Sequence, residues 1–359
     1  MPSQLPGSAK IDWIKVIFLW TLGLYVSGCA SFSQRNSELM PRVLDSGIIA
    51  PDGGSVFVTA EAAGIPQVWK VNEPLGVMTQ LTFGTEANHV VAITLDGRFV
   101  VIRRQGKSES EAGLFLLPRE GGALVEVQDV NGVRASYVSC SSDGEMIVYL
   151  ANDLKSDSFA LYSYEFESGK RELLFSEPGD WSVTDTFGGI FFLMGRSKGE
   201  GEKEYFVWNL GTGALQPLVG QKTKGIYNVG FAQNNGEYLV LTTADTTRRQ
   251  LQLLRGGSLR PIEAVADLDV SSFVTDLRHS KIYVSWRENN RLRLEILHGG
   301  NFAKQSLKGL PEGGSIFVGQ PSRFGRYVGL RVEHTSARQS IYMIDWGTAK
   351  ATEWIRQSF

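Results

Sequence analysis

A turn signal followed by a short apolar run recurs along the whole chain. The copies begin at Asp52, Asp96, Asp143, Phe187, Asn235, His279 and Phe324, which are 44, 47, 44, 48, 44 and 45 residues apart. Asp-Gly and Asn-Gly favour tight hairpin turns, because glycine accepts a positive φ and Asp or Asn can cap its own turn. The run after each signal is rich in Val, Ile, Phe and Tyr, which is typical of strands packed on both faces. The pattern predicts seven repeated β-units.

A second apolar run, with an aromatic or aliphatic centre, follows in each unit. These runs are 67–71, 113–117, 160–164, 205–208, 251–254, 292–296 and 340–344. A glycine-containing turn such as 120–123 follows, and a final strand such as 78–82 or 171–175 closes the unit. With the strand that precedes each turn signal, a unit of about 45 residues holds four strands, which is the content of one propeller blade.

Helical patterns are weak by comparison. No window after residue 40 has a sustained apolar stripe at helical spacing, and the chain's 40 glycines fall at turn spacing. The sequence therefore predicts an all-β protein, a seven-bladed β-propeller of four-stranded blades over residues 43–359. A β-sandwich and a double propeller are the more distant alternatives.

The first unit carries a recognisable motif. Ala-Pro-Asp-Gly at 50–53, Val-Phe-Val at 56–58, Gly-Ile-Pro-Gln-Val-Trp at 64–69 and Gln-Leu-Thr at 80–82 closely resemble the Pro-Asp-Gly repeat of TolB and of the prolyl oligopeptidase propeller. The match is fair in the next two units and is mainly a hydrophobic pattern afterwards. It covers about 310 residues in outline. The motif is structural, so the resemblance implies a fold and names no substrate.

The chain also departs from both families. TolB carries an additional α/β domain ahead of its propeller, and residues 30–49 are too few for one. Prolyl oligopeptidases add a C-terminal hydrolase domain with a nucleophilic serine, whereas this sequence ends at Phe359, directly after the seventh unit. The resemblance therefore implies a propeller that stands alone.

The first residues have the order of a secretory signal. Lys10 and Lys15 precede an apolar run at 16–25, and Val-Ser-Gly-Cys at 26–29 resembles the lipobox of bacterial lipoproteins. By that resemblance, residues 1–28 are a signal peptide, cleavage precedes Cys29, and the Cys29 thiol receives lipid. Fatty acyl chains such as palmitate would then hold the protein on a membrane. Residues 29–42 would form the lipidated tether.

The apolar run also bears on location. It spans about ten residues, roughly half of the ~20 that a membrane-crossing helix needs, so a permanent transmembrane anchor is disfavoured. Ala30 and Ser31 follow the cysteine, and no Asp stands in the position that commonly retains lipoproteins at the inner membrane. The resemblance thus implies the periplasmic side of the outer membrane, with the outer face of the cytoplasmic membrane as the alternative.

The charge of the chain bears on its binding partners, and its cysteine content bears on disulfide bonds. Removing residues 1–28 takes away two of 36 basic and one of 38 acidic side chains, and leaves a formal charge of −3. Nucleic acid is an unfavourable partner, because phosphate binding needs a clustered positive field. With Cys29 lipidated, Cys140 is the remaining cysteine, so no internal disulfide forms. Cys140, in the predicted strand 135–140, is expected to be a small buried apolar side chain.

Motifs for catalysis are weak. The nearest matches to a nucleophile elbow, at 53–57 and 313–317, lack the closing glycine and precede strands rather than helices. The four histidines are His89, His279, His298 and His334, and none is close to another in the sequence. His279 occupies the turn position that Asp or Asn holds elsewhere, so a turn role is favoured. No catalytic residue, cofactor or metal site is predicted.

Two residue types leave interpretations open. Arg103-Arg104, Arg248-Arg249 and the pair Arg291 and Arg293 fall near hairpin ends in three units, and form either a shared basic rim or scattered solvated charge, with scattered charge favoured. Trp181 and Trp354 lie outside the strand pattern, where an exposed position is expected.

Three functions remain open. The leading hypothesis is a non-enzymatic binding or scaffold lipoprotein that engages a protein partner in the cell envelope. The second is an enzyme whose site lies on one face of the propeller, of the glycan lyase or glycosidase type. The third is the detached propeller half of a divided peptidase. The sequence does not indicate an oligomeric state, and propellers host unrelated functions.

Overall fold

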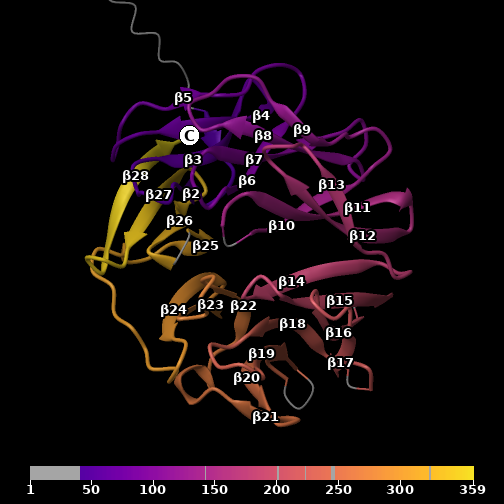
Figure 1. Ribbon diagram of the computed structural model, residues 1–359. Coiled ribbons are helices and arrows are strands. Elements are labelled where there is room, and N and C mark those ends of the chain that lie inside the picture. The colour runs from indigo at the N-terminus through magenta and orange to yellow at the C-terminus, as the bar shows by residue number, and fades with distance from the viewer. Residues whose placement is uncertain (1–40, 142, 200–201, 223, 244–246, 323–324) are drawn as a thin grey trace, which may run out of the picture. The chain divides into compact units, whose positions relative to one another are not determined.

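The protein is an all-β propeller built from seven antiparallel sheets (Figure 1). The computed structural model describes residues 41–359, except 142, 200–201, 223, 244–246 and 323–324. Within these residues the predicted fold is confirmed, and its first strand begins at Arg42. The signal peptide at 1–28, Cys29 and the tether up to residue 40 lie outside the described residues.

The sheets follow one another around the ring in chain order. Blade 1 holds β1 (Arg42–Val43), β2 (Ile48–Ile49), β3 (Val56–Ala62), β4 (Ile65–Val71) and β5 (Thr79–Gln80). Blade 2 holds β6 (Asn88–Ile93), β7 (Phe99–Gln105), β8 (Ala112–Pro118) and β9 (Val125–Gln128), and blade 3 holds β10 (Ala135–Cys140), β11 (Met146–Lys155), β12 (Ser158–Glu165) and β13 (Arg171–Phe175). Blade 4 holds β14 (Trp181–Phe187), β15 (Phe191–Gly199), β16 (Glu202–Asn209) and β17 (Leu215–Val219).

The second half of the chain completes the ring. Blade 5 holds β18 (Ile226–Phe231), β19 (Glu237–Thr242), β20 (Gln250–Arg255) and β21 (Ser258–Pro261), followed by a short 3-10 helix at Glu263–Val265. Blade 6 holds β22 (Val270–Thr275), β23 (Lys281–Glu288) and β24 (Arg291–His298). Blade 7 holds β25 (Ser315–Pro321), β26 (Tyr327–Thr335), β27 (Arg338–Asp345) and β28 (Lys350–Ser358). The innermost strand of each blade surrounds the centre of the ring (Figure 1).

Two blades depart from the expected four strands. In blade 1 the inner strand is split into β1 and β2, which both pair with β3. The split falls at Asp45, whose carboxylate accepts hydrogen bonds from the backbone N–H groups of Gly47 and Thr59 at 3.0 and 2.8 Å. The carboxylate therefore takes the place of a ladder carbonyl. In blade 6 only three strands form among the described residues, because the glycine-rich segment 299–314 makes only isolated bridges, one from Lys304 to Leu297 of β24 and one from Lys308 to Lys350 of β28.

The hydrophobic cores lie between neighbouring blades. One cluster joins Val101 and Leu114 of blade 2 to Ile147 and Tyr149 of blade 3, and all four are 0 % exposed. The seven clusters follow the ring, as expected when each sheet buries both faces against its neighbours.

The expectation that Trp181 and Trp354 are exposed is wrong. Trp181 begins β14 and Trp354 lies in β28, and they are 2 % and 4 % exposed. The Trp181 ring packs edge-on against Phe175 of blade 3, with the ring centres 5.3 Å apart. A tryptophan in this position fills the space between two blades, which a reading of single strands does not reveal.

Side chains close the ring between its first and last blades, which lie side by side (Figure 1). Among the described residues, no strand of blade 1 enters the sheet of blade 7. The Val43 N–H instead donates to Gln357 Oε1 at 2.9 Å, and Gln339 Nε2 donates to the Val43 carbonyl at 2.7 Å. Gln339 Nε2 also donates to Gln357 Oε1 at 2.9 Å, and Gln357 donates to the Pro41 carbonyl. This glutamine clamp, formed by Gln339 and Gln357, is buried, and it joins the first strand of the propeller to its last blade.

Candidate functional site

The propeller presents two kinds of loops at its two ends. Because each blade is a run of antiparallel hairpins, the turns between its first and second strands and between its third and fourth strands lie at one end of the ring, here named the turn face. The hairpins between the second and third strands lie at the opposite end, here named the hairpin face. The repeated turn signals that begin at Asp52, Asp96, Asp143, Phe187, Asn235 and His279 lie on the turn face.

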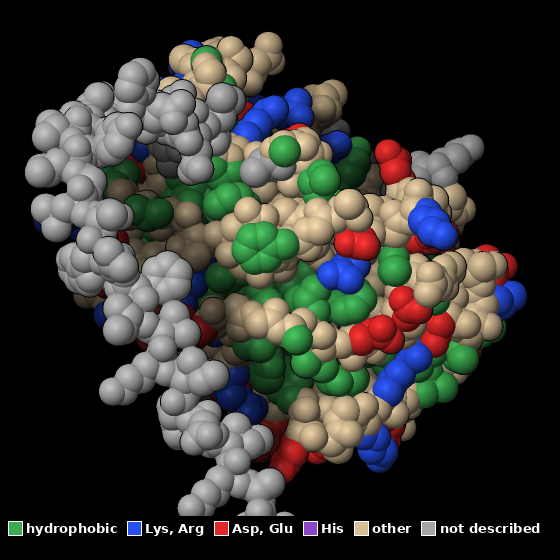
Figure 2. Space-filling view, turned by 90° about the horizontal axis from the view of Figure 1, so that it is seen from above, with side chains coloured by type: hydrophobic (Ala, Val, Ile, Leu, Met, Phe, Trp, Pro, Cys, Tyr) green, Lys and Arg blue, Asp and Glu red, His purple; other side chains and the backbone are tan. Residues whose placement is uncertain are grey.

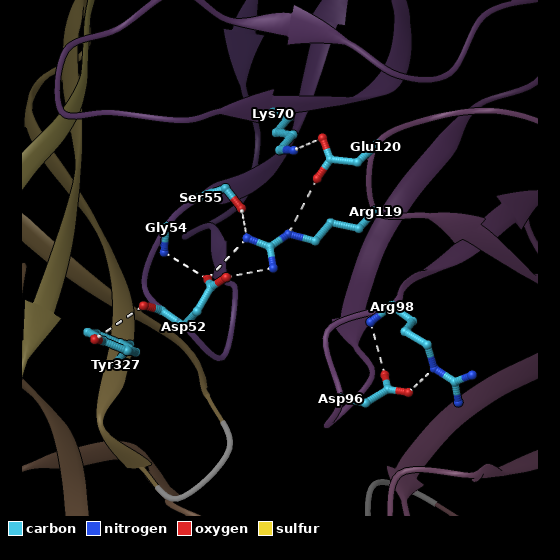
Figure 3. Close-up of polar contacts among 9 residues, drawn as sticks. All are labelled: Asp52, Gly54, Ser55, Lys70, Asp96, Arg98, Arg119, Glu120 and Tyr327. Atoms are coloured by element: carbon cyan, nitrogen blue, oxygen red, sulfur yellow. Dashed lines mark hydrogen bonds and ion pairs between the residues drawn. The ribbon is translucent and has the colours of Figure 1, made fainter.

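The Pro-Asp-Gly turn of blade 1 connects three blades (Figure 3). Asp52 receives two hydrogen bonds from the guanidinium of Arg119 in blade 2, at 2.7 and 3.0 Å. The Tyr327 hydroxyl of blade 7 lies 3.5 Å from the Asp52 carbonyl. Gly53 has φ +73°, and a Cβ there would lie 2.5 Å from the Tyr327 ring. Both the turn and the neighbouring blade therefore require glycine at this position.

A second contact on the same face joins blades 1 and 2. Lys70 Nζ lies 2.6 Å from Glu120 Oε2, and the Lys70 side chain is only 6 % exposed (Figure 3). Glu120 Oε1 also lies 3.7 Å from Arg119 Nε. The charged residues nearest to the motif are thus engaged with one another, which indicates a structural role.

The aspartates of the repeated turns cap their own backbone, as predicted. The carboxylates of Asp52, Asp96 and Asp143 accept the N–H two residues later at 2.8, 2.9 and 3.0 Å. The hydrogen bonds from Arg119 lower the pKa of Asp52, and the Ser141 hydroxyl lowers the pKa of Asp143. For Asp96, partial burial opposes the change, but bonds from Thr94 and Arg98 bring its pKa below the usual range. These carboxylates remain ionised and held in place.

A central channel runs between the inner strands and has a cavity volume of about 450 Å³. Its apolar lining comes from residues such as Ile93, Val138, Val183 and Phe273. Its polar lining consists largely of hydroxyls and amides, contributed by Thr94, Ser136, Tyr137, Ser139, Thr184, Thr186, Asn228, Thr275, Gln320 and Ser322. Burial raises the pKa of Tyr137, so its hydroxyl stays protonated. A cavity of this size and lining can hold a small polar molecule.

Three of the lining residues carry a formal charge: Arg103, Asp185 and Asp276. The Asp276 carboxylate accepts hydrogen bonds from the Ser280 N–H at 2.6 Å and the Ser280 hydroxyl at 2.5 Å, so it is engaged by its own turn. The Asp185 carboxylate accepts the N–H groups of Thr186 and Phe231, each at 2.8 Å. Both acids are therefore occupied by backbone and neighbouring side chains.

His279 adds a contact that joins three blades. Its Nε2 lies 3.0 Å from Asp185 Oδ2, and its ring is 1 % exposed beside Phe187 and Phe231. The predicted turn role is confirmed, since the backbone has φ +53° at the turn between β22 and β23. The link to Asp185, 94 residues earlier, has no sequence signal.

The basic residues singled out in the sequence lie in blades 2, 5 and 6 and are held mainly by local contacts. Arg104 bonds Asn88 at 3.0 Å and stacks on Phe115. Arg249 stacks on Tyr227, and Arg293 pairs with Glu288 at 3.0 Å. Arg248 donates to the Asp267 carbonyl at 2.7 Å, and the exposed Arg291 lies at the start of β24. These contacts agree with the scattered arrangement that the sequence favoured.

Arg103 is different, because it lines the channel and has Arg134 of blade 3 as a charged neighbour. Sequence reasoning missed Arg134, which lies 31 residues from Arg103 and in no motif.

Two further predictions concern cysteine and metals. Cys140 lies in β10 as expected, but it is half-buried and lines the channel, so a fully buried position is wrong. The reason is that β10 is an innermost strand, and its side chains reach the channel as well as the core. Among the described residues, no group of three or more metal-ligating side chains gathers.

No helix in the described part of the chain is both long and apolar enough to cross a membrane.

No family model and no curated protein matches this chain. Solved structures do match in fold. One comes from a structural and mechanistic study of two prolyl endopeptidases that addresses inter-domain dynamics in catalysis and specificity. The match has a TM-score of 0.66 and 13 % identity, and it covers 89 % of this chain and 50 % of that one. The chain therefore spans about half the length of that protein, and it is a seven-bladed β-propeller similar in fold to the propeller of a prolyl endopeptidase.

Proposed function

We propose that this protein is a lipid-anchored binding or scaffold module of the cell envelope that engages a protein partner. Lipid at Cys29 would hold it on the periplasmic side of the outer membrane. The propeller would act as a rigid body that presents loops and edges to the partner, without catalysis.

The observation that carries this proposal is a group of exposed apolar side chains on blade 1. Leu75, Val77 and Phe83 are 56 %, 86 % and 70 % exposed, and all three lie in the segment between β4 and β6. Hydrophobic side chains are visible among charged ones on the side of the ring drawn in Figure 2. Large apolar side chains that are exposed within one short segment are a candidate interaction surface.

The start of the described chain supports an orientation on the membrane. Arg42 and Val43 pair with Glu61 and Ala60, at the end of β3 next to its hairpin with β4. The chain therefore enters the propeller at the hairpin face. A linker of residues 29–40 spans at most about 40 Å when extended, so lipid at Cys29 would hold the hairpin-face end of β1 within about that distance of the membrane.

Crosslinking tests the partner. A photoreactive amino acid in place of Val77 or Phe83, in the full-length protein expressed in its own cells, is expected to capture a specific envelope protein. The double variant Val77→Ser and Phe83→Ser is expected to recover at least tenfold less of that protein in a pull-down, because the apolar contact is lost. The matched control is Leu154→Ser, since Leu154 is 61 % exposed but lies in blade 3. If the wild type, the double variant and Leu154→Ser recover equal amounts of the captured protein, Val77 and Phe83 are not part of the binding surface.

Mass spectrometry tests the anchor. The mature protein is expected to begin at residue 29 with an acylated thiol, and Cys29→Ala is expected to move the protein from the membrane fraction to the soluble fraction. An unmodified Cys29 within a chain that starts at Met1 would remove the envelope assignment.

A further inference from the structure

Arg103 brings a positive charge to the wall of the central channel. It lies near the end of β7, directly across the ladder from His89 of β6. Its side chain is half-buried, and it is the one cationic residue among those that line the channel in the described chain. Arg134, just before β10, adds a second positive charge nearby.

In the described part of the chain, neither guanidinium has a counter-charge. No described carboxylate lies within ion-pair distance of Arg103 or Arg134, whereas Arg98, Arg119, Arg171, Arg196 and Arg255 each have such a partner. The two acids of the channel cannot serve, because Asp185 and Asp276 are engaged by other groups. Partial burial and Arg134 lower the pKa of Arg103, and burial and Arg103 lower the pKa of His89. A partly buried charge without a partner costs free energy that a bound anion would recover.

The other side chains that line the channel indicate which chemical groups such an anion would have. The channel offers many hydroxyl and amide groups around a volume of about 450 Å³, within the range of sites for small molecules. One guanidinium on the wall matches one negative charge and presents the forked donors that fit a carboxylate. The surrounding hydroxyls and amides can bond hydroxyl groups on the body of the ligand.

We propose that the channel is a binding site for a small organic acid with one carboxylate on a hydroxyl-bearing body, of the sugar-acid class, and that Arg103 holds its carboxylate. The hydroxyl-bearing body lies against side chains such as Ser136, Thr184 and Asn228. Arg134 keeps the region electropositive without contacting the ligand. This site does not depend on the proposed protein partner or on the lipid.

Calorimetric titration tests the site with three probes: D-glucuronate, D-glucose and inorganic phosphate. The protein titrated is the proposed mature chain, residues 29–359. Glucuronate is expected to bind at least tenfold more tightly than glucose, because only glucuronate carries the carboxylate. Arg103→Met is expected to weaken glucuronate binding at least tenfold, since the charge-assisted hydrogen bonds are lost. Glucuronate is also expected to raise the Tm of the wild type and leave that of Arg103→Met unchanged.

The matched control is Arg287→Gln, which removes an exposed arginine of blade 6 outside the channel and is expected to bind glucuronate like the wild type. Arg103→Met is expected to fold with a Tm at or above that of the wild type, because it removes an uncompensated charge. No glucuronate binding at 10 mM, equal binding by Arg103→Met, or a preference for phosphate over glucuronate would each overturn the proposal.

Discussion

At the scale of single residues, the aspartates of the repeated turns stabilise the backbone of those turns. Asp52, Asp96 and Asp143 each cap a turn with one carboxylate oxygen, and Asp52 also receives the guanidinium of Arg119. These bonds are stronger to the ionised carboxylate than to the neutral acid, and for that reason the pKa of each is lowered. A lowered pKa in the folded state adds stability above the unfolded value of about 4, and that stability is lost as the pH falls below it.

Asp52→Asn is expected to reduce the pH dependence of stability at the acid side. The amide can still cap the turn, but it does not pair with Arg119. Because the Asp52 side chain is 56 % exposed, we expect a loss of less than about 1 kcal/mol at pH 7. Urea denaturation at pH 7 and pH 3 measures the difference, which is expected to be smaller at pH 3, because Asp52 takes up a proton as the pH approaches its lowered pKa. Asp157→Asn, in an exposed pair with Lys155, is the control, and an identical pH profile for both variants would contradict this account.

At the scale of elements, the blades are joined by contacts between residues far apart in the chain. Asp185 of β14 accepts the Phe231 N–H of β18 and pairs with His279 in the turn before β23. One carboxylate thus links blades 4, 5 and 6, and the rings of Phe187 and Phe231 cover the buried His279 side of the pair. In such surroundings a hydrogen bond to a charged group contributes more than one at the surface.

His279→Asn is expected to destabilise the protein by about 2 kcal/mol, because asparagine tolerates the positive φ but removes one of the two hydrogen bonds to Asp185 Oδ2, the one that reaches blade 6. Equilibrium urea unfolding gives the value. The control is His298→Asn, since His298 accepts only the local Gly300 N–H at 3.1 Å. A change as large in the control as in His279→Asn would contradict the inter-blade role.

At the scale of the whole molecule, the ring depends on how its ends meet. Gln339 and Gln357 of blade 7 hold both backbone groups of Val43 in blade 1. The glutamines are 4 % and 2 % exposed, so water does not replace these bonds when they are lost. Apolar contacts of Val43, Ile49, Ile341 and Ile355 surround the clamp.

Replacing both glutamines, Gln339→Leu and Gln357→Leu, is expected to destabilise the ring by about 2–5 kcal/mol, because it leaves two buried backbone groups without partners. Hydrogen exchange of the Val43 amide is expected to accelerate before that of the cores between other blades. Gln252→Leu, a buried glutamine of blade 5, is the control. If the control loses as much stability, the clamp is not what closes the ring.

Some features of the fold depend on neighbouring residues in the sequence, and others depend on packing between blades. Turn chemistry and alternating apolar residues depend on near neighbours, so the seven repeats, their second strands and the turn role of His279 were predictable. The missing fourth strand of blade 6 had a local signal that the repeat spacing outweighed, because segment 299–314 holds five glycines and a proline, which disfavour strands. The buried positions of Trp181 and Trp354 were not predictable, because burial there comes from the adjacent blade.

The sequence by itself determined an all-β chain of seven repeats, since hairpin turns and strand periodicity are encoded within a few residues. Only the tertiary structure decided which side chains face the channel and which partners they have. Arg103 and Arg134 belong to different blades, as do Asp185 and His279, and Val43 meets Gln357 only when the ring closes. The physical reason is that distances between blades depend on the packing of whole sheets around one axis, and no local pattern along the chain carries that information.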